Sequence, residues 1–136
     1  MSNLNETVKD IYRLTVMWVA TAANTLFGGT DGIFLTLIIF MSIDYITGVC
    51  AAIVNKQVSS RIGARGLAKK IGILCVVSLA TLIEKNVIDT TALRTAVILY
   101  YISNEGISIF ENITRIGVPV PKKLKELLGH LTDENS

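Results

Sequence analysis

The sequence predicts an all-α integral membrane protein with three to four transmembrane helices and a short amphipathic helix near the C-terminus. Hydrophobic residues make up 51% of the chain and charged residues 18%, whereas an average soluble domain has about 25% charged residues. The charges are also unevenly placed, because residues 32–43, 45–54 and 71–83 contain no Asp, Glu, Lys or Arg. We expect residues 1–136 to form a single membrane domain.

The first candidate helix covers residues 14–29, LTVMWVATAANTLFGG. Crossing the hydrocarbon core of a bilayer takes about 20 predominantly apolar residues. This segment is shorter, and four of its side chains are Thr or Asn. Three interpretations stay open: the helix crosses the membrane, stops part-way, or lies in the interface with Trp18 as its aromatic anchor.

Residues 32–54 and 67–87 are the two strongest candidate spans. The first, GIFLTLIIFMSIDYITGVCAAIV, has one charged residue, Asp44, near its middle. The second has an uncharged centre with charged residues on both sides. Each segment is long enough to cross the bilayer as a helix.

The fourth candidate helix, residues 91–116, is apolar at first and then becomes two-sided. Its polar residues recur every three or four positions, so we expect them to share one helix face opposite Ile102 and Ile109. Such a face either hydrates the wall of a pore or is the solvated face of a helix on the membrane surface. The polar candidates are Asn104, Glu105, Ser108, Glu111 and Asn112.

Pro119 is expected to end this helix, because proline lacks an N–H donor and disfavours a helical conformation in the residue before it. A basic amphipathic tail helix is predicted for residues 121–131. Its leucines share one face beside lysines, and these residues are Leu124, Leu127, Leu128 and Leu131 with Lys122, Lys123 and Lys125.

The charge of the connecting segments predicts the orientation, because cytoplasmic loops are enriched in Lys and Arg. Residues 55–70 contain no acid and five bases, which are Lys56, Arg61, Arg65, Lys69 and Lys70. A topology with four spans and both termini in the cytoplasm agrees with the Lys and Arg content of every loop. A three-span alternative leaves one terminus outside. The basic linker is primarily an orientation signal, with binding of anionic lipid as a second role.

Asp44 is the leading candidate for a functional residue, because an ionisable group near the middle of a span is costly. On a helix it shares a face with Gly48 and Ala52, with Ala51 alongside, and small residues let two helices approach closely. One interpretation makes this face an oligomerisation seam and Asp44 a gating group. The other gives Asp44 an intramolecular partner in the same bundle.

No catalytic motif is present: the chain lacks HExxH, GxSxG, a phosphate-binding glycine loop and a Cys/His cluster. We therefore expect no enzyme activity, no cofactor and no metal. The net charge of +2 is small and the bases adjoin apolar runs, so we expect no nucleic-acid partner.

Five short motifs occur in a characteristic order: IDYITG at residues 43–48, SSR at 59–61, GLAKKI at 66–71, NEGISIFEN at 104–112 and GVPVPKKL at 117–124. Because these motifs occur in this order and spacing, the chain resembles the phage lysis and toxin-secretion holin family of Gram-positive bacteria and their phages. The similarity extends over residues 34–128, which is most of the chain.

The resemblance implies a homo-oligomer that accumulates in the bacterial cytoplasmic membrane and opens lesions in it at a set time. The released cargo is then an endolysin for host lysis or a large toxin for secretion, and an antiholin is a further expected type of partner. The family has no established catalytic residues to transfer to this chain.

Two other classes of function compete with this one. A small transporter or channel subunit is expected to show inverted repeats or broken helices, and neither is evident here. A membrane adaptor that anchors a partner through its basic tail has no need for polar residues inside its spans. Asp44 and the polar residues of segment 104–112 therefore count against the adaptor.

Overall fold

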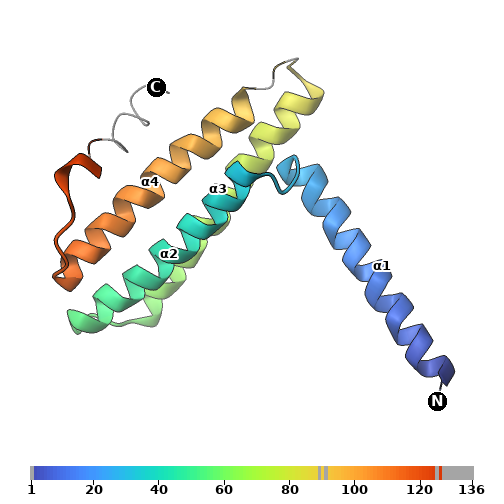
Figure 1. Cartoon of the computed structure of the whole chain (residues 1–136), viewed down its shortest axis with the longest axis horizontal. Coiled ribbons are helices and arrows are strands. Elements are labelled where there is room, and N and C mark those ends of the chain that lie inside the picture. The colour runs from blue at the N-terminus through green and yellow to red at the C-terminus, as the bar shows by residue number, and fades with distance from the viewer. Residues whose placement is uncertain (1, 89, 91, 125, 127–136) are drawn as a thin grey trace.

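The computed structural model describes residues 2–88, 90, 92–124 and 126 of the chain. It contains four helices, α1 (Ser2–Phe27), α2 (Gly32–Val54), α3 (Ser60–Asn86) and α4 (Leu93–Ile116). No strand occurs among these described residues, so the predicted all-α class is confirmed. Figure 1 shows α2, α3 and α4 side by side as a bundle, while α1 extends away from one end of it.

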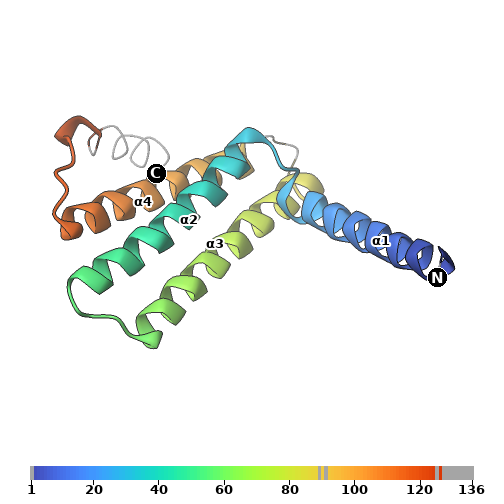
Figure 2. The same ribbon diagram turned by 60° about the horizontal axis from the view of Figure 1, so that its bottom comes forward.

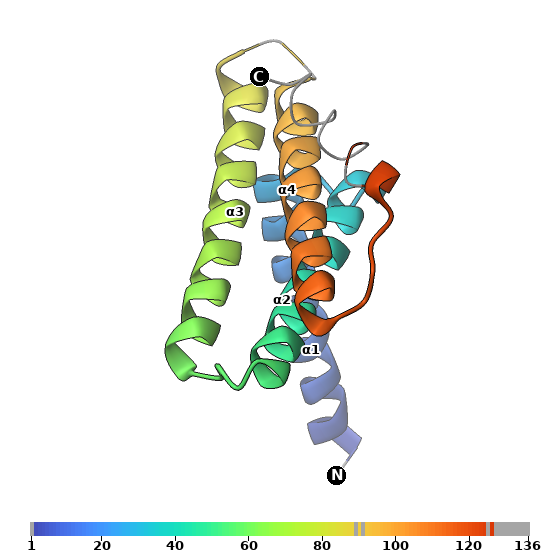
Figure 3. The same cartoon turned by 90° about the vertical axis from the view of Figure 1, so that its left-hand side faces the viewer.

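The bundle is held together mainly through α4, which packs along α2 and also contacts α3. Its buried apolar centre contains Leu37 and Met41 of α2, Val77 of α3, and Ile98 and Ile102 of α4. Figure 3 shows that the α2–α3 connection and the end of α4 lie at the same end of the bundle. Helices α2 and α4 therefore run in the same direction, with α3 antiparallel to both.

Local chemistry fixes the helix ends. The carboxylate of Asp31 accepts a hydrogen bond from the Phe34 N–H at 3.1 Å, and Ser59 Oγ accepts one from the Ile62 N–H at 3.2 Å. Each side chain satisfies an N–H group that has no partner within the first turn of its helix. At the end of α4, Gly117 has a φ of 100°, a left-handed conformation that favours glycine.

The observed boundaries differ from the predicted ones chiefly at two helix starts. Helix α2 covers the predicted residues 32–54, and α4 begins two residues later than predicted and ends at the predicted residue. Helix α1 begins at Ser2 instead of residue 14, and α3 begins at Ser60 instead of residue 67.

The early start of α3 corrects the interpretation of residues 55–70 as a linker. Only residues 55–59 connect the two helices, and four of the five bases lie within the first turns of α3. Gly63 and Gly66 lie within this helix. The ring of Tyr45 lies beside Gly66, 3.6 Å from the position of a Cβ atom built there, which is an ordinary contact distance.

The predicted tail helix is described only in part. Residues 122–124 and 126 are helical and exposed. The remaining predicted positions, Lys125, Leu127, Leu128 and Leu131, lie outside the described residues.

Two of the described helices, α2 and α3, are long and apolar enough to cross a membrane. Only 22% of the most apolar stretch of α2 and 28% of that of α3 is buried within the chain. A core helix of a soluble protein is mostly buried, whereas these helices present apolar side chains outward. This distribution agrees with lipid around the bundle.

Candidate functional site

The centre of the bundle contains a charge network contributed by three helices. Lys70 of α3 lies between Asp44 of α2, at 2.6 Å from Nζ to Oδ2, and Glu105 of α4, with which it also forms an ion pair. Lys69 Nζ lies 3.1 Å from the other Glu105 oxygen. Asp44, Lys70 and Glu105 are 9%, 7% and 0% exposed, so the three side chains are buried.

The network is electrically balanced, since it contains two carboxylates and two ammonium groups. This balance matters because an unpaired charge within a membrane or a protein core is expensive. Removing one partner of a buried pair typically costs about 3–5 kcal/mol. The pairing of Asp44 with Lys70 and Glu105 therefore also fixes the relative positions of α2, α3 and α4.

Asn112 connects α4 to α2 next to these charges. Its Nδ2 donates to the Asp44 carboxylate at 3.1 Å, to the Asp44 carbonyl at 3.3 Å and to Thr47 Oγ1 at 3.3 Å. Gly48 makes room for this contact, because a Cβ atom there would lie 3.4 Å from the same Nδ2. A Cβ would therefore just touch Asn112, and a larger side chain at this position would press on α4.

The structure therefore places Asp44 as the intramolecular interpretation expects, with a lysine of the same bundle as its partner. Gly48 faces α4 of its own chain, Ala51 is buried, and Ala52 lines a pocket beside the network. A single chain does not test whether the same face also contacts a second copy. The oligomerisation seam stays a prediction.

The predicted separation of a polar from an apolar face on α4 is wrong. Ile102, Glu105, Ile109 and Asn112 are all buried and recur at helical spacing on one face. Of the other predicted polar residues, Asn104 and Ser108 are half-buried and Glu111 is exposed. Ion pairs and hydrogen bonds explain the mixed face, because they let Glu105 and Asn112 be buried among isoleucines.

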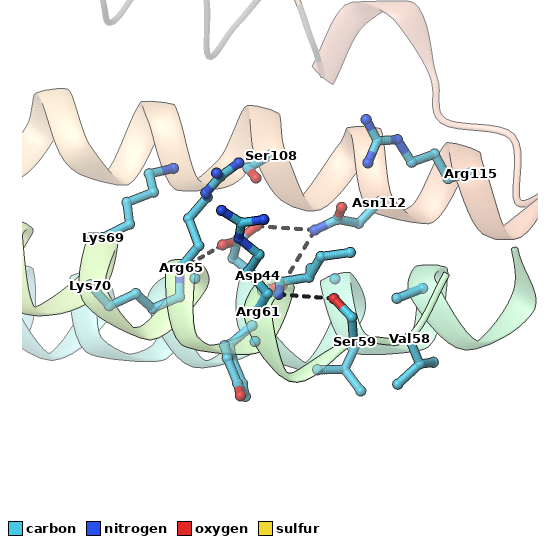
Figure 4. Close-up of a pocket in the computed structure, with 17 residues that line it drawn as sticks. Asp44, Val58, Ser59, Arg61, Arg65, Lys69, Lys70, Ser108, Asn112 and Arg115 are labelled. Carbon is cyan, nitrogen blue, oxygen red and sulfur yellow. Dashed lines mark hydrogen bonds and ion pairs between the residues drawn. The ribbon is translucent and has the colours of Figure 1, made fainter. Parts of the chain in front are cut away.

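A pocket of about 670 Å³ adjoins the network at the end of the bundle that carries the α2–α3 connection. Figure 4 shows the bases at the start of α3 on one side of it and Ser108, Asn112 and Arg115 of α4 on the other. Lys56, the remaining base of the predicted linker, does not line it and is exposed.

A second polar cluster, at the opposite end of the bundle, fixes the junction of α1 and α2. Arg94 at the start of α4 pairs with Asp31 through two contacts of 2.7 and 3.0 Å, and its Nε donates to the Phe27 carbonyl at 2.6 Å. Glu84 of α3 accepts from the Arg94 backbone N–H at 2.8 Å. A Cβ atom on Gly28 would lie 2.8 Å from Arg94 Nε, so glycine is needed there.

Sequence reasoning missed this clamp, in which Arg94 holds Asp31 and the Phe27 carbonyl. The sequence did contain a signal for this ion pair, because the acid Asp31 and the base Arg94 lie at the same predicted membrane boundary. Beyond the junction, α1 is almost entirely exposed, including Trp18. Figure 2 shows α1 extending away from the three-helix bundle.

The hydrogen bond from Arg94 lowers the pKa of Asp31 below its ordinary value of 3.8. The clamp is therefore fully present above that value and is lost as the pH falls through the lower pKa of the folded protein. We expect the distance between spin labels at Val8 and Leu79, in a cysteine-free background, to become broadly distributed only at such acidic pH. Asp31→Asn should be broad at every pH, and an equally narrow distribution in this variant would contradict the clamp.

Comparison with known proteins places the chain among phage and bacterial sequences. The model of the bacteriophage holin family matches residues 21–133. A probable holin of Bacillus phage phi105 is 36% identical over 111 residues, which cover 81% of each chain. An uncharacterised protein of Clostridium perfringens strain 13 is 38% identical over 126 residues, 91% of this chain and 93% of the relative.

An uncharacterised protein of Listeria monocytogenes is 42% identical over 103 residues, 76% of this chain and 74% of the relative. No solved structure matches the chain. The family found by these comparisons is the one that the order of sequence motifs suggested.

Proposed function

Because the chain belongs to the bacteriophage holin family, we propose that it self-associates in the bacterial cytoplasmic membrane and permeabilises the membrane at a set time. The cargo released is an endolysin, which then reaches the cell wall, or a large toxin. The name of the phage phi105 relative, a probable holin, supports the same role. The observation that carries the proposal is a balanced polar network enclosed in a bundle whose outer surface is apolar.

This arrangement suits a protein that changes state within the membrane. While the bundle is closed, lipid meets apolar side chains and the charges of Asp44, Lys70 and Glu105 are paired. If the helices separate and reassemble with those of other copies, the same polar groups can face water along a lesion. A simple membrane anchor gains nothing from burying three charged groups.

The oligomerisation seam in this proposal is the α2 face that contains Gly48, Ala51 and Ala52. In the closed chain α4 covers part of this face, so pairing between copies requires α4 to move. Glu105, Ser108 and Asn112 then become available to line the lesion. Asp44 lies at the point where α2 and α4 separate, which is why we assign it the gating role.

For the topology, the proposal makes α4 a third span in addition to α2 and α3. Helix α4 lies along α2, and its charged residue Glu105 is paired within the bundle. The basic start of α3 and the end of α4 share the cytoplasmic side, in accord with the positive-inside bias. The C-terminal end of helix α1 lies on the outer side of the membrane in this topology. If α1 crosses the membrane as a fourth span, the N-terminus is in the cytoplasm.

Labelling of single cysteines by an impermeant maleimide in intact cells tests this topology. In a variant with Cys50 and Cys75 replaced by Ala, a cysteine at Ile88 should react and one at Gln57 should not. Cysteines at Asn3 and Glu134 should also be protected. Labelling at Asn3 but not at Glu134 would contradict the four-span arrangement and favour three spans.

The function itself is tested by inducing the chain in bacteria that also produce an endolysin without an export signal. We expect a sudden fall in optical density and in dye-reported membrane potential after a delay. Asp44→Asn should still insert, because Lys70 keeps Glu105 as its partner. It should shift the time of this event, because moving one charge through the potential is worth about 2.3 kcal/mol per 100 mV.

Glu111→Gln is the matched control, since it removes an exposed carboxylate from α4 and should leave the timing unchanged. If Asp44→Asn and wild type trigger together and respond identically to an uncoupler, the gating role of Asp44 is wrong. If no permeabilisation follows induction of the wild type, the proposed function is wrong.

A further inference from the structure

The pocket at the basic end of the bundle holds more positive charge than the buried network uses. Its lining includes five bases and one acid. Lys69 and Lys70 are engaged with Asp44 and Glu105. The other three bases, Arg61, Arg65 and Arg115, are exposed and form no ion pair with an acid in the described part of the chain.

These three arginines come from both sides of the pocket. Arg61 and Arg65 are one helical turn apart at the start of α3, and Arg115 is in the last turn of α4 (Figure 4). A guanidinium group presents several N–H donors in a planar fork that matches the oxygens of a phosphate group. An anion in the pocket can therefore contact two helices at once.

Part of the remaining lining is apolar and reaches the outer surface of the bundle. Val49 of α2, Val58 of the connection and Ile62 of α3 line the pocket and are 38%, 65% and 53% exposed. A small inorganic anion makes no use of such a wall, whereas the glycerol and the first methylenes of a lipid do. Bases next to exposed apolar side chains make the pocket complementary to an amphiphile.

We propose that this pocket binds an anionic phospholipid, with the lipid phosphate held by Arg61, Arg65 and Arg115 and the start of its acyl chains against Val58 and Ile62. The pocket lies at the bundle end that the basic residues assign to the cytoplasmic surface, where such headgroups are located. The bound phosphate ties α3 to α4 and offsets the repulsion among the arginines. Anionic lipid thus favours the closed bundle.

The full-length chain in phosphatidylcholine vesicles provides the test. Electron paramagnetic resonance of trace spin-labelled lipids gives the association constant of phosphatidylglycerol relative to phosphatidylcholine. Replacing the three arginines by Gln should reduce this preference about fivefold for each arginine that contacts the phosphate. The control Lys56→Gln/Lys122→Gln/Lys123→Gln removes the same charge outside the pocket. It should reduce the ratio much less than the arginine variant does, because none of its bases lines the pocket.

An equal loss of preference in both triple variants, or no loss in either, would overturn the proposal. Inorganic phosphate, compared with chloride at the same ionic strength, distinguishes the source of the anion. If it displaces the spin-labelled phosphatidylglycerol, the pocket is a small-anion site and the assignment to lipid is wrong. Should the triple arginine variant fail to accumulate, Arg115→Gln alone should still show about a fivefold loss. None of these readouts depends on permeabilisation, so they are independent of the proposed function.

Discussion

Lys70→Met is expected to prevent the chain from accumulating as a folded bundle. The substitution leaves Asp44 without a cation and Glu105 with only the half-exposed Lys69. Loss of one member of a buried ion pair costs about 3–5 kcal/mol, which is a large part of the stability of a small domain. The measurement is the amount of membrane-inserted protein, together with thermal unfolding in a neutral detergent.

Lys69→Met is the matched control. The side chain of Lys69 is 53% exposed, and its ion pair with Glu105 is screened by solvent, so the loss should be much smaller. The triple variant Asp44→Asn/Lys70→Met/Glu105→Gln should recover most of the stability, because it removes the charges together. Equal accumulation of Lys70→Met and Lys69→Met would contradict the role of the network.

Gly48→Leu is expected to produce the second largest loss. A Cβ atom at Gly48 already lies 3.4 Å from Asn112 Nδ2, so the branched side chain of Leu must push α4 away from α2. Overpacking of this kind typically costs about 1–3 kcal/mol. Separation of the two helices also weakens the hydrogen bonds from Asn112 to Asp44.

Gly72→Leu on α3 serves as the control, because no atom lies within 4 Å of a Cβ built there. Thermal unfolding and crosslinking, measured at equal protein levels, separate the two interpretations of the Gly48 face. A lower unfolding temperature shows that the face acts within the chain. Loss of the oligomer ladder with an unchanged unfolding temperature would instead make it a contact between copies only.

Much of the fold follows from hydrophobic patterning. The start and end of α2 could be predicted because Gly32 and Val54 bound an apolar run flanked by polar residues, with Asp31 as a capping side chain. The start of α3 could not be predicted from composition, because its first turns are basic and contain Gly63 and Gly66. In the folded chain the side chain of Tyr45 lies beside both glycines, a contact that depends on the packing of α2 against α3.

The partners of Asp44 were beyond sequence reasoning for a different reason. Patterning identifies a costly charge in a span, but Lys70 and Glu105 are distant along the chain, and only the crossing of three helices brings them together. The burial of Glu105 was in principle detectable, since Ile98, Ile102, Glu105 and Ile109 recur at the spacing of one helix face. Its polarity led to the opposite assignment.

The release of a labelled protein from vesicles tests the central claim most directly. The purified full-length chain is reconstituted into vesicles that contain both a small dye and a fluorescent protein of the size of an endolysin, and the potential across the membrane is then collapsed. Our account predicts that both markers escape together. Release of the small dye with full retention of the protein would contradict it and indicate a narrow channel instead.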